Sequence, residues 1–204
     1  MSMPKLLLAT NNRAKVEEYT RLLLGIPYAI VNLADVGIKM IVDETGATLE
    51  ENAALKAKTY ATLSKLLTMA DDSGLEVDTL GGQPGVLSAR YAGEEATDKE
   101  RIDFLLVKLG DTPWEKRAAR FRCIIAITSS EGEVELFTGE CKGIIAFKPT
   151  GEKGFGYDPI FYLPQLGKTM AELSMDEKNE ISHRGQAVIK ARRILEQRVA
   201  EFKS

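Results

Sequence analysis

Two adjacent carboxylates, Asp71 and Asp72, occupy the segment ADDSGLEV between two apolar stretches of the chain. A carboxylate can bind a divalent cation or take a proton from a water molecule, and burying one without a partner is costly. Because side chains alternate along a strand, the two aspartates either face opposite sides of a strand or straddle its end. In the first case one carboxylate faces a ligand and the other is structural. The alternative is that both end the strand and cap a turn through Ser73 and Gly74.

A second polar segment, TNNRAK, covers residues 10–15 and follows a short apolar run. It is typical of a strand-to-helix junction, where unsatisfied backbone N–H groups and the positive end of the helix dipole suit a phosphate. Thr10 and Asn12 add side-chain donors there, and Lys15 adds a mobile positive charge. Since the segment lacks the glycine spacing of a P-loop, an ordinary turn with a helix N-cap is the alternative.

Asp43 and Glu44 precede a Thr-Gly pair just before a helical pattern. Mg²⁺ takes oxygen ligands and usually only one or two protein carboxylates, with phosphates and water completing its shell. Either of these acids together with Asp72 would supply such a pair. The alternative is a pair of solvated surface acids.

The segment GFGYD places Phe155 between Gly154 and Gly156. Glycines let the backbone approach a ligand closely, and the face of an aromatic ring suits stacking on a nucleobase. A glycine-rich turn whose aromatic residues belong to the core is the alternative.

The single histidine of the chain, His183, lies in the segment EKNEISHRG. With Ser182 as the N-cap, His183 and Arg184 fall in the first turn of the last helix, where cations oppose the helix dipole. A bound anion, or acceptor groups of a ligand, would relieve this cost, and Lys178 adds a positive charge toward the same end. A purely structural histidine is the alternative.

Alternating strand and helix patterns must position these residues. Strands are predicted over residues 5–10 and 28–33, around the ADDSG motif, and over 119–128 and 134–147 with a hairpin turn between the last two. Helices are predicted from residue 16 to 23, from a Thr48–Glu51 capping box to Leu67, over 97–109, and from Ser182 onward. This pattern predicts an α/β fold with a mixed parallel and antiparallel sheet flanked by helices, in which residues 1–204 form a single domain.

Composition limits the class of protein. Of the 204 residues, 44% are hydrophobic and 28% are charged, which is typical of a folded globular chain. The net charge of −3 argues against binding to a nucleic-acid backbone. Cys123 and Cys141 match no zinc spacing and are expected to be reduced thiols. Since neither a signal peptide nor a span of about 18 apolar residues is recognised, we expect a cytoplasmic protein with no nucleic-acid or membrane partner.

Five segments in this order resemble the inosine triphosphate pyrophosphatase family, whose members remove nonstandard purine nucleoside triphosphates. The segments are ATNNRAK, ETGATLEENAALKA, ADDSGLEVDTLGGQPGVLSARYAG, GFGYDPIF and GKTMAELSMDEKNEISHRGQA. The resemblance covers nearly the whole chain, and the third and fifth segments are long and specific.

The resemblance implies two lobes around a central cleft, a homodimer, Mg²⁺ as the cofactor, and hydrolysis of ITP, dITP and XTP to the monophosphate and pyrophosphate. It makes Asp72 the general base and a metal-associated carboxylate. The implied substrate-binding residues are Thr10, Asn11, Asn12, Arg13, Ala14, Lys15, Ser73, Phe155, Gly156, Tyr157, Asp158, Lys178, His183 and Arg184. The family commonly carries glutamate where this chain has Asp43, so either Asp43 binds the metal through water or Glu44 takes its place.

Two other functions stay open on the residues alone. A Maf-like nucleotide pyrophosphatase would share the architecture and prefer other bases. A nucleotide-binding regulator or single-strand RNA binder would use Phe155 and Tyr157 as a stacking platform, bind without turnover, and show a steep salt dependence.

Overall fold

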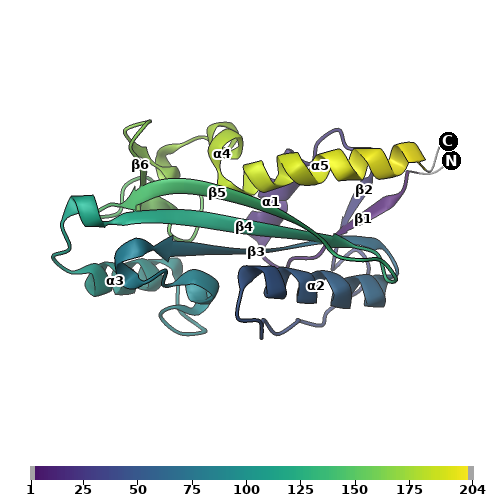
Figure 1. The fold of residues 1–204 in the computed structure, drawn as a ribbon, viewed down its shortest axis with the longest axis horizontal. Helices are drawn as coiled ribbons and strands as arrows, with labels where there is room; N and C mark the ends of the chain where they lie inside the picture. The colour runs from purple at the N-terminus through teal and green to yellow at the C-terminus, as the bar shows by residue number, and fades with distance from the viewer. Residues whose placement is uncertain (1–2, 202–204) are drawn as a thin grey trace. The chain divides into compact units, whose positions relative to one another are not determined.

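The computed structural model describes residues 3–201 and follows the predicted alternation of strands and helices (Figure 1). In chain order the elements are β1 (Lys5–Leu8), α1 (Arg13–Leu22), β2 (Ala29–Asn32), α2 (Leu49–Ser64), β3 (Leu67–Val77), α3 (Asp98–Leu109), β4 (Ala118–Thr128), β5 (Glu135–Ile145), β6 (Phe161–Leu163), β7 (Lys168–Thr169), α4 (Met175–Ile181) and α5 (His183–Glu201). Within the described residues, no helix combines the length and the apolarity that crossing a bilayer requires.

The strands form one seven-stranded sheet in the order β2-β1-β3-β4-β5-β6-β7. β1 pairs in parallel with both β2 and β3, whereas β6 pairs antiparallel with β5 and β7. The predicted α/β fold with a mixed sheet flanked by helices is therefore confirmed.

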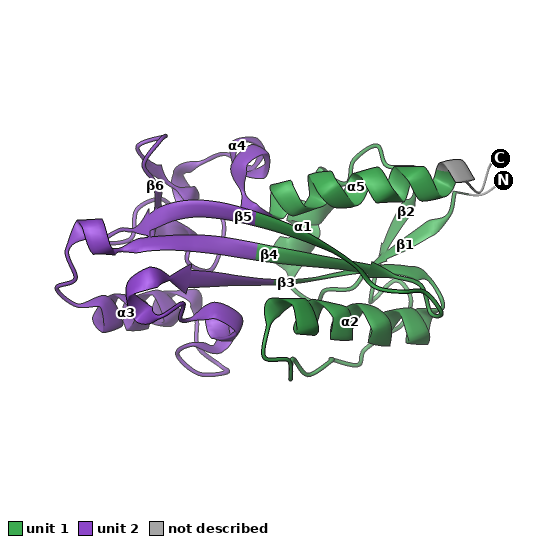
Figure 2. Ribbon diagram, in the orientation of Figure 1, with its two compact units in different colours: residues 1–72, 123–139, 184–204 green, residues 73–122, 140–183 purple. Residues whose placement is uncertain are grey.

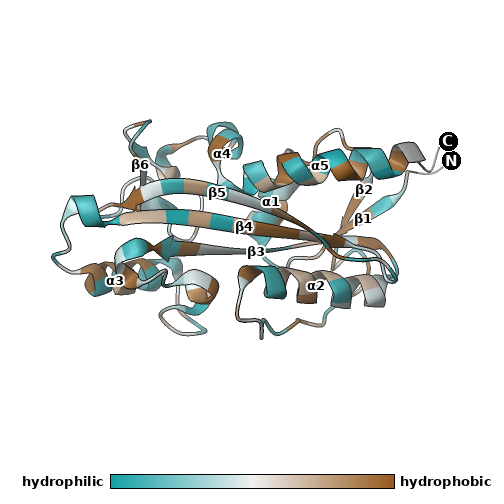
Figure 3. Ribbon diagram, viewed as in Figure 1, coloured by the Kyte–Doolittle hydropathy of each residue, from teal (hydrophilic) through white to brown (hydrophobic). Residues whose placement is uncertain are grey.

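The chain divides into two compact units (Figure 2). Unit 1 comprises residues up to Asp72, Cys123–Gly139, and residues from Arg184 onward; unit 2 comprises Ser73–Arg122 and Glu140–His183. Each unit is assembled from separate chain segments, and β3, β4 and β5 each contribute residues to both. The hydropathy of β4 changes at this division: residues 123–127 are uninterruptedly apolar, whereas Arg120 and Arg122 interrupt the part before them (Figure 3).

The core of unit 1 lies between its strands and the helices α1 and α5. Leu6, Met69 and Ile125 from the strands pack with Tyr19 of α1 and Leu195 of α5, and all five are buried. α2 lies on the opposite side of the strands of this unit (Figure 2). Of its predicted apolar stripe, Leu49, Ala53, Ala57 and Tyr60 are buried, whereas Leu63 is 50% exposed. The helix was predicted to reach Leu67, but it ends at Ser64, because Lys65 adopts a left-handed conformation and Leu67 begins β3.

The core of unit 2 is built on α3 and on the outer parts of the long strands. Ile102 and Leu105 of α3 pack with Leu75 of β3, Phe121 of β4 and Phe161 of β6. A complete capping box starts α3, since Thr97 and Glu100 each bond the other's backbone N–H. The helix predicted over 97–109 is thereby confirmed.

One helix, α4, was not predicted. Ser174 accepts a hydrogen bond from the backbone N–H of Glu177, whose carboxylate bonds back to Ser174 N. This Ser-x-x-Glu capping box was a readable signal in the sequence. Ser182, predicted as the N-cap of the last helix, directly follows α4, and its backbone N–H closes that helix by donating to Lys178 O at 2.8 Å.

Candidate functional site

The two adjacent aspartates lie inside β3, which continues without interruption to Val77. The alternative that they end the strand and cap a turn is therefore wrong. Both are buried, with 3% and 5% of their surfaces exposed. Each is compensated from a different helix: Lys15 of α1 donates to Asp71 at 2.8 Å, and Lys56 of α2 donates to Asp72 at 2.9 Å. The strand can bury the pair because its alternation sends them to opposite faces, each with a lysine in reach.

Asp72 belongs to a buried polar group within unit 1. Its Oδ1 accepts from Lys56 Nζ, and its Oδ2 accepts from Asn52 Nδ2 at 3.3 Å. Asn52 and Lys56 lie four residues apart on α2, so both side chains reach the same carboxylate. Lys56 Nζ also lies 2.5 Å from Glu44 Oε1, and Asn52 Oδ1 accepts from Gly46 N at 2.7 Å. The loop before α2 is thus tied to Asp72 at two points.

The electrostatics of this group favour a proton acceptor at Asp72. Burial raises the pKa of Asp72 most strongly, Lys56 opposes this effect, and Glu44 raises the pKa further, so that it stands above its ordinary value. Burial by itself lowers the pKa of Lys56, but the carboxylates around it raise it well above the ordinary value. Lys56 therefore stays protonated and partly offsets the effect of burial on the pKa of Asp72.

Of the two metal-ligand candidates before α2, Glu44 is the one that an ion pair connects to Asp72, through Lys56. Glu44 is partly buried and shares the Lys56 ammonium with Asp72, whereas Asp43 is exposed. Among residues 3–201, no three His, Cys, Asp or Glu side chains gather in a way that could hold a metal ion. A pair of carboxylates meeting at one cation still fits Mg²⁺, because phosphates and water complete its shell.

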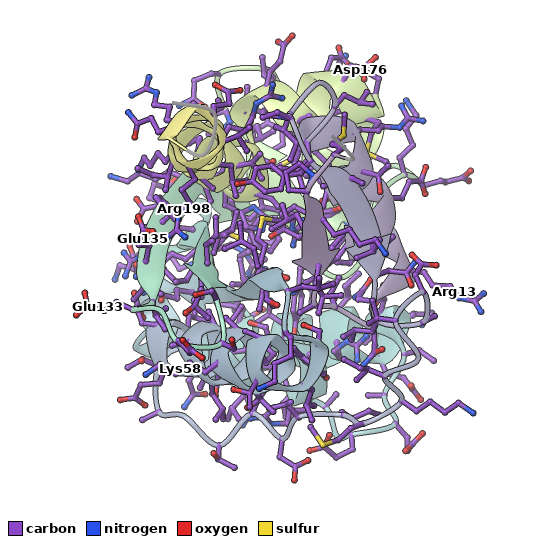
Figure 4. All side chains as sticks on the ribbon, turned by 90° about the vertical axis from the view of Figure 1, so that its right-hand side faces the viewer. Arg13, Lys58, Glu133, Glu135, Asp176 and Arg198 are labelled. Carbon is purple, nitrogen blue, oxygen red and sulfur yellow. The ribbon has the colours of Figure 1, made fainter. Side chains whose placement is uncertain are left out.

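The loop before α1 has the predicted junction geometry. Asn12 is the N-cap: its Oδ1 accepts from Lys15 N at 3.1 Å, and its own N–H donates to Thr10 Oγ1 at 3.2 Å. The ordinary N-cap interpretation is therefore correct as far as the local structure goes, and it leaves the helix N-terminus available to an anion. Asn11 and Arg13 are exposed, and the Arg13 side chain extends away from the ribbon (Figure 4). Ala14 is half-buried.

Arg184 lies deep in unit 1, where the sequence predicted a cation facing a ligand. It forms an ion pair with Glu18 of α1, its guanidinium lies 5.9 Å from the centre of the Tyr19 ring, and only 3% of it is exposed. Sequence reasoning missed Glu18, the protein carboxylate that compensates this cation. Arg184 also lowers the pKa of Asp71.

Asp71 is expected to contribute to stability in a pH-dependent way. Burial raises its pKa, but Lys15, Arg184 and Lys56 outweigh burial and hold the pKa well below its ordinary value. A carboxyl whose pKa is lower in the folded than in the unfolded state stabilises the protein above about pH 4, and this contribution fades as the pH falls toward the folded pKa. Asp71→Asn should therefore lower the free energy of unfolding at pH 7 by about 2 kcal/mol and make its decline below about pH 4 shallower.

Urea titrations between neutral and acidic pH would measure both effects. The matched control is Glu17→Gln on α1, because the Glu17 side chain is exposed and pairs with Arg21 of the same helix at 3.9 Å. Equal acid dependence of Asp71→Asn and the wild type would contradict the assignment of this carboxyl.

Within unit 2, Phe155, Asp158 and Lys178 form a second group. Asp158 Oδ2 accepts from Phe155 N at 2.9 Å and from Lys178 Nζ at 2.6 Å. Lys178 Nζ also lies 5.0 Å from the centre of the Phe155 ring. A Cβ on Gly154 would lie 2.0 Å from Asp158 Oδ2, and φ is +75° there, so this position requires glycine. The loop wraps around one buried carboxylate and leaves the Phe155 side chain half-buried.

The other predicted residues of unit 2 lie in distinct surroundings. Tyr157 is buried, and its hydroxyl donates to Ser88 O at 3.0 Å, which makes it a core residue rather than part of a stacking platform. His183 is buried and stacks on Phe121, with ring centroids 4.8 Å apart and an interplanar angle of 16°. Ser73 is half-buried in β3, next to Asp72 in the chain.

Sequence reasoning also missed Asn52 and Lys56. Their signal was present, since two polar residues four positions apart lie within the otherwise apolar stripe of α2. The role of Lys56 was not predicted because a lysine on a helix is usually solvated, and no residue near it in the sequence indicates a buried carboxylate opposite it.

Comparisons with known proteins extend to nearly the whole chain. A family model described as the Ham1 family matches residues 6–194. The chain is similar to a protein named dITP/XTP pyrophosphatase from Bacillus subtilis (strain 168), with 46% identity over 194 residues that cover 95% of this chain and 98% of the relative. A relative of the same name from Yersinia pestis is 49% identical over 188 residues, which cover 91% of this chain and 95% of the relative. A solved HAM1 protein from Coxiella burnetii is 40% identical, has a TM-score of 0.87, and is matched over 96% of this chain and 100% of its own.

Proposed function

Because the chain belongs to the Ham1 family, we propose that it is an enzyme that hydrolyses nonstandard purine nucleoside triphosphates, ITP, dITP and XTP, to the monophosphate and pyrophosphate. The relatives named dITP/XTP pyrophosphatase support this substrate class. The observation that carries the proposal is the buried group of Asp72, Lys56 and Glu44, which joins a proton acceptor to a second carboxylate.

Asp72 acts as the general base in this proposal. A water oxygen attacks the α-phosphorus, the bond from that phosphorus to the oxygen bridging to the β-phosphorus breaks, pyrophosphate leaves, and the water proton passes to Asp72. The raised pKa of Asp72 makes it a better acceptor than a solvated aspartate. The Lys56 ammonium favours the ionised form of the carboxylate, and the Asn52 amide fixes its orientation.

Mg²⁺ is the proposed cofactor, with Glu44 and Asp72 as its ligands. When bound there, it would lower the pKa of a coordinated water and neutralise part of the triphosphate charge. Glu44 and Asp72 fit because both carboxylates already meet at one cationic group, Lys56 Nζ. Asp43 contributes at most through water, since its side chain lies exposed.

The triphosphate is proposed to lie at the N-terminus of α1. The donors are the backbone N–H groups of Asn11, Arg13 and Ala14, the hydroxyl of Thr10 and the side-chain amide of Asn12, and Lys15 supplies charge. The proposed substrate-binding set is completed by Ser73, Phe155, Gly156, Asp158, Lys178, His183 and Arg184, with Phe155 stacking on the base. Tyr157 supports the Phe155 loop from the core. The same proposal includes two lobes around a central cleft, a single domain over residues 1–204, a homodimer and a cytoplasmic location.

Selectivity is expected to come from the six-position of the purine. Hypoxanthine and xanthine present a carbonyl at C6 and a protonated N1, whereas adenine presents an amino group and a bare N1. Donors that suit the carbonyl are left unpaired by adenine, and each buried unpaired donor costs about 1–3 kcal/mol. GTP shares the C6 carbonyl and has to be rejected at the two-position.

Pyrophosphate release in the presence of Mg²⁺ tests this proposal. We expect kcat/KM for ITP and XTP to exceed the values for ATP and GTP by about 100-fold or more. Comparable values for all four nucleotides would refute the proposed selectivity. Faster turnover of UTP or dTTP would favour the Maf-like alternative, and nucleotide binding without turnover would favour a regulator.

A further inference from the structure

We propose that Asp98, the first residue of α3, is a positioning residue that fixes the Phe155–Gly156 peptide and thereby directs the Phe155 ring toward the purine. The inference rests on the proposed function, in which Phe155 stacks on the base. The observation is a contact within unit 2 between residues far apart in the sequence: Asp98 Oδ2 accepts a hydrogen bond from Gly156 N at 2.7 Å.

The backbone on either side of the Phe155 Cα is held by a carboxylate. Phe155 N donates to Asp158 Oδ2 at 2.9 Å, and the next N–H along the chain, that of Gly156, donates to Asp98. These two N–H groups belong to the two peptide units that meet at the Phe155 Cα. Since φ and ψ of a residue are set by its two flanking peptide planes, the pair of bonds determines the direction in which the ring leaves the backbone.

Asp98 is itself held in place. Its Oδ1 forms an ion pair with Arg101 one helical turn later, which leaves Oδ2 for Gly156. Arg101 NH1 is anchored by two backbone carbonyls, Ala89 O at 2.7 Å and Ala96 O at 2.6 Å. The carboxylate thus divides its two oxygens between a fixed guanidinium and the loop.

The position of Asp98 at the start of a helix does not by itself account for this arrangement. An acidic residue there is favoured by the helix dipole. However, the helix is already capped by the reciprocal bonds of Thr97 and Glu100. Loss of the Asp98 carboxylate should therefore leave α3 intact and release only one side of the Phe155 backbone.

The experiment compares Asp98→Ala and Asp98→Asn with the wild type, using ITP turnover and calorimetric binding of IMP and of inorganic pyrophosphate, all with Mg²⁺. Asp98→Ala should raise the KM for ITP and the Kd for IMP by about tenfold, and leave kcat and the Kd for pyrophosphate within about twofold. Asp98→Asn, which keeps an acceptor for Gly156 N, should recover most of the loss. The control is Asp103→Ala on the same helix, whose exposed carboxylate pairs with Lys99 at 2.6 Å, and it should behave like the wild type.

Four results would overturn the inference. Unchanged IMP binding in Asp98→Ala would show that the bond does not position the ring. Equal losses of IMP and pyrophosphate binding would show a general structural effect, as would failure of Asp98→Asn to restore IMP binding. A wild-type protein that neither turns over ITP nor binds IMP overturns the proposed function and this inference with it, whereas normal wild-type turnover together with an unaffected Asp98→Ala overturns this inference alone.

Discussion

Asp72→Asn is expected to lower kcat for ITP by about 100-fold or more while leaving the Kd for IMP within about threefold. Asparagine has nearly the size of aspartate, and its carbonyl oxygen can still accept from Lys56, so the buried group should persist with the loss of only the weaker bond from Asn52. It cannot take the proton of the attacking water. A loss confined to kcat is the signature of an interaction needed in the transition state rather than in binding.

Steady-state kinetics with ITP and calorimetry with IMP would measure the two quantities. Asp78→Asn is the matched control, since Asp78 directly follows β3 and its side chain is 60% exposed. It should retain kcat within about twofold. A kcat near the wild-type value in Asp72→Asn would remove this carboxylate from the mechanism.

The second large effect is expected for Glu44→Gln. This change removes one of the two carboxylates that meet at Lys56, and should raise the Mg²⁺ concentration for half-maximal activity about tenfold and lower kcat/KM about 30-fold. The neighbouring change Asp43→Asn removes an equal charge from an exposed position. It should leave both the Mg²⁺ concentration for half-maximal activity and kcat/KM within about twofold of the wild-type values. The rate of pyrophosphate release as a function of Mg²⁺ concentration would be measured for the wild type, Glu44→Gln and Asp43→Asn.

The comparison of the two variants decides which acid before α2 binds the metal. An effect of Asp43→Asn as large as that of Glu44→Gln would contradict the assignment to Glu44. Unchanged Mg²⁺ dependence in both variants would remove this loop from the metal site.

Most of the fold could be predicted because its signals are local. The apolar run of β1, the N-cap at Thr48 and the inward stripe of α5 depend on residues within a few positions of each other. The capping box predicted at Thr48 forms only in part, because Thr48 accepts from Glu51 N but the Glu51 carboxylate accepts from Ala47 N instead of Thr48 N. Val188, Ala191, Leu195 and Val199 of that stripe are buried as expected, and Phe202 lies outside the described residues. The family was also predictable from its long motifs, and the match to the Ham1 family over residues 6–194 confirms it.

The partners of the buried charges could not be predicted in the same way. The two members of each pair lie apart in the sequence and meet only in the folded protein. The pairs are Lys56 with Asp72, Glu18 with Arg184, and Asp98 with Gly156. The length of β3 was also missed, because two adjacent aspartates usually interrupt a strand. They are tolerated here because each has a lysine from a different helix.

The central claim is that a water molecule attacks the α-phosphorus of the nucleotide, with Asp72 as the base. Hydrolysis of ITP in ¹⁸O-labelled water, followed by mass spectrometry of both products, tests this claim most directly. We predict that the label appears in IMP and that the pyrophosphate carries none. Label in pyrophosphate or in orthophosphate, with unlabelled nucleotide, would place the attack on another phosphorus and contradict the account.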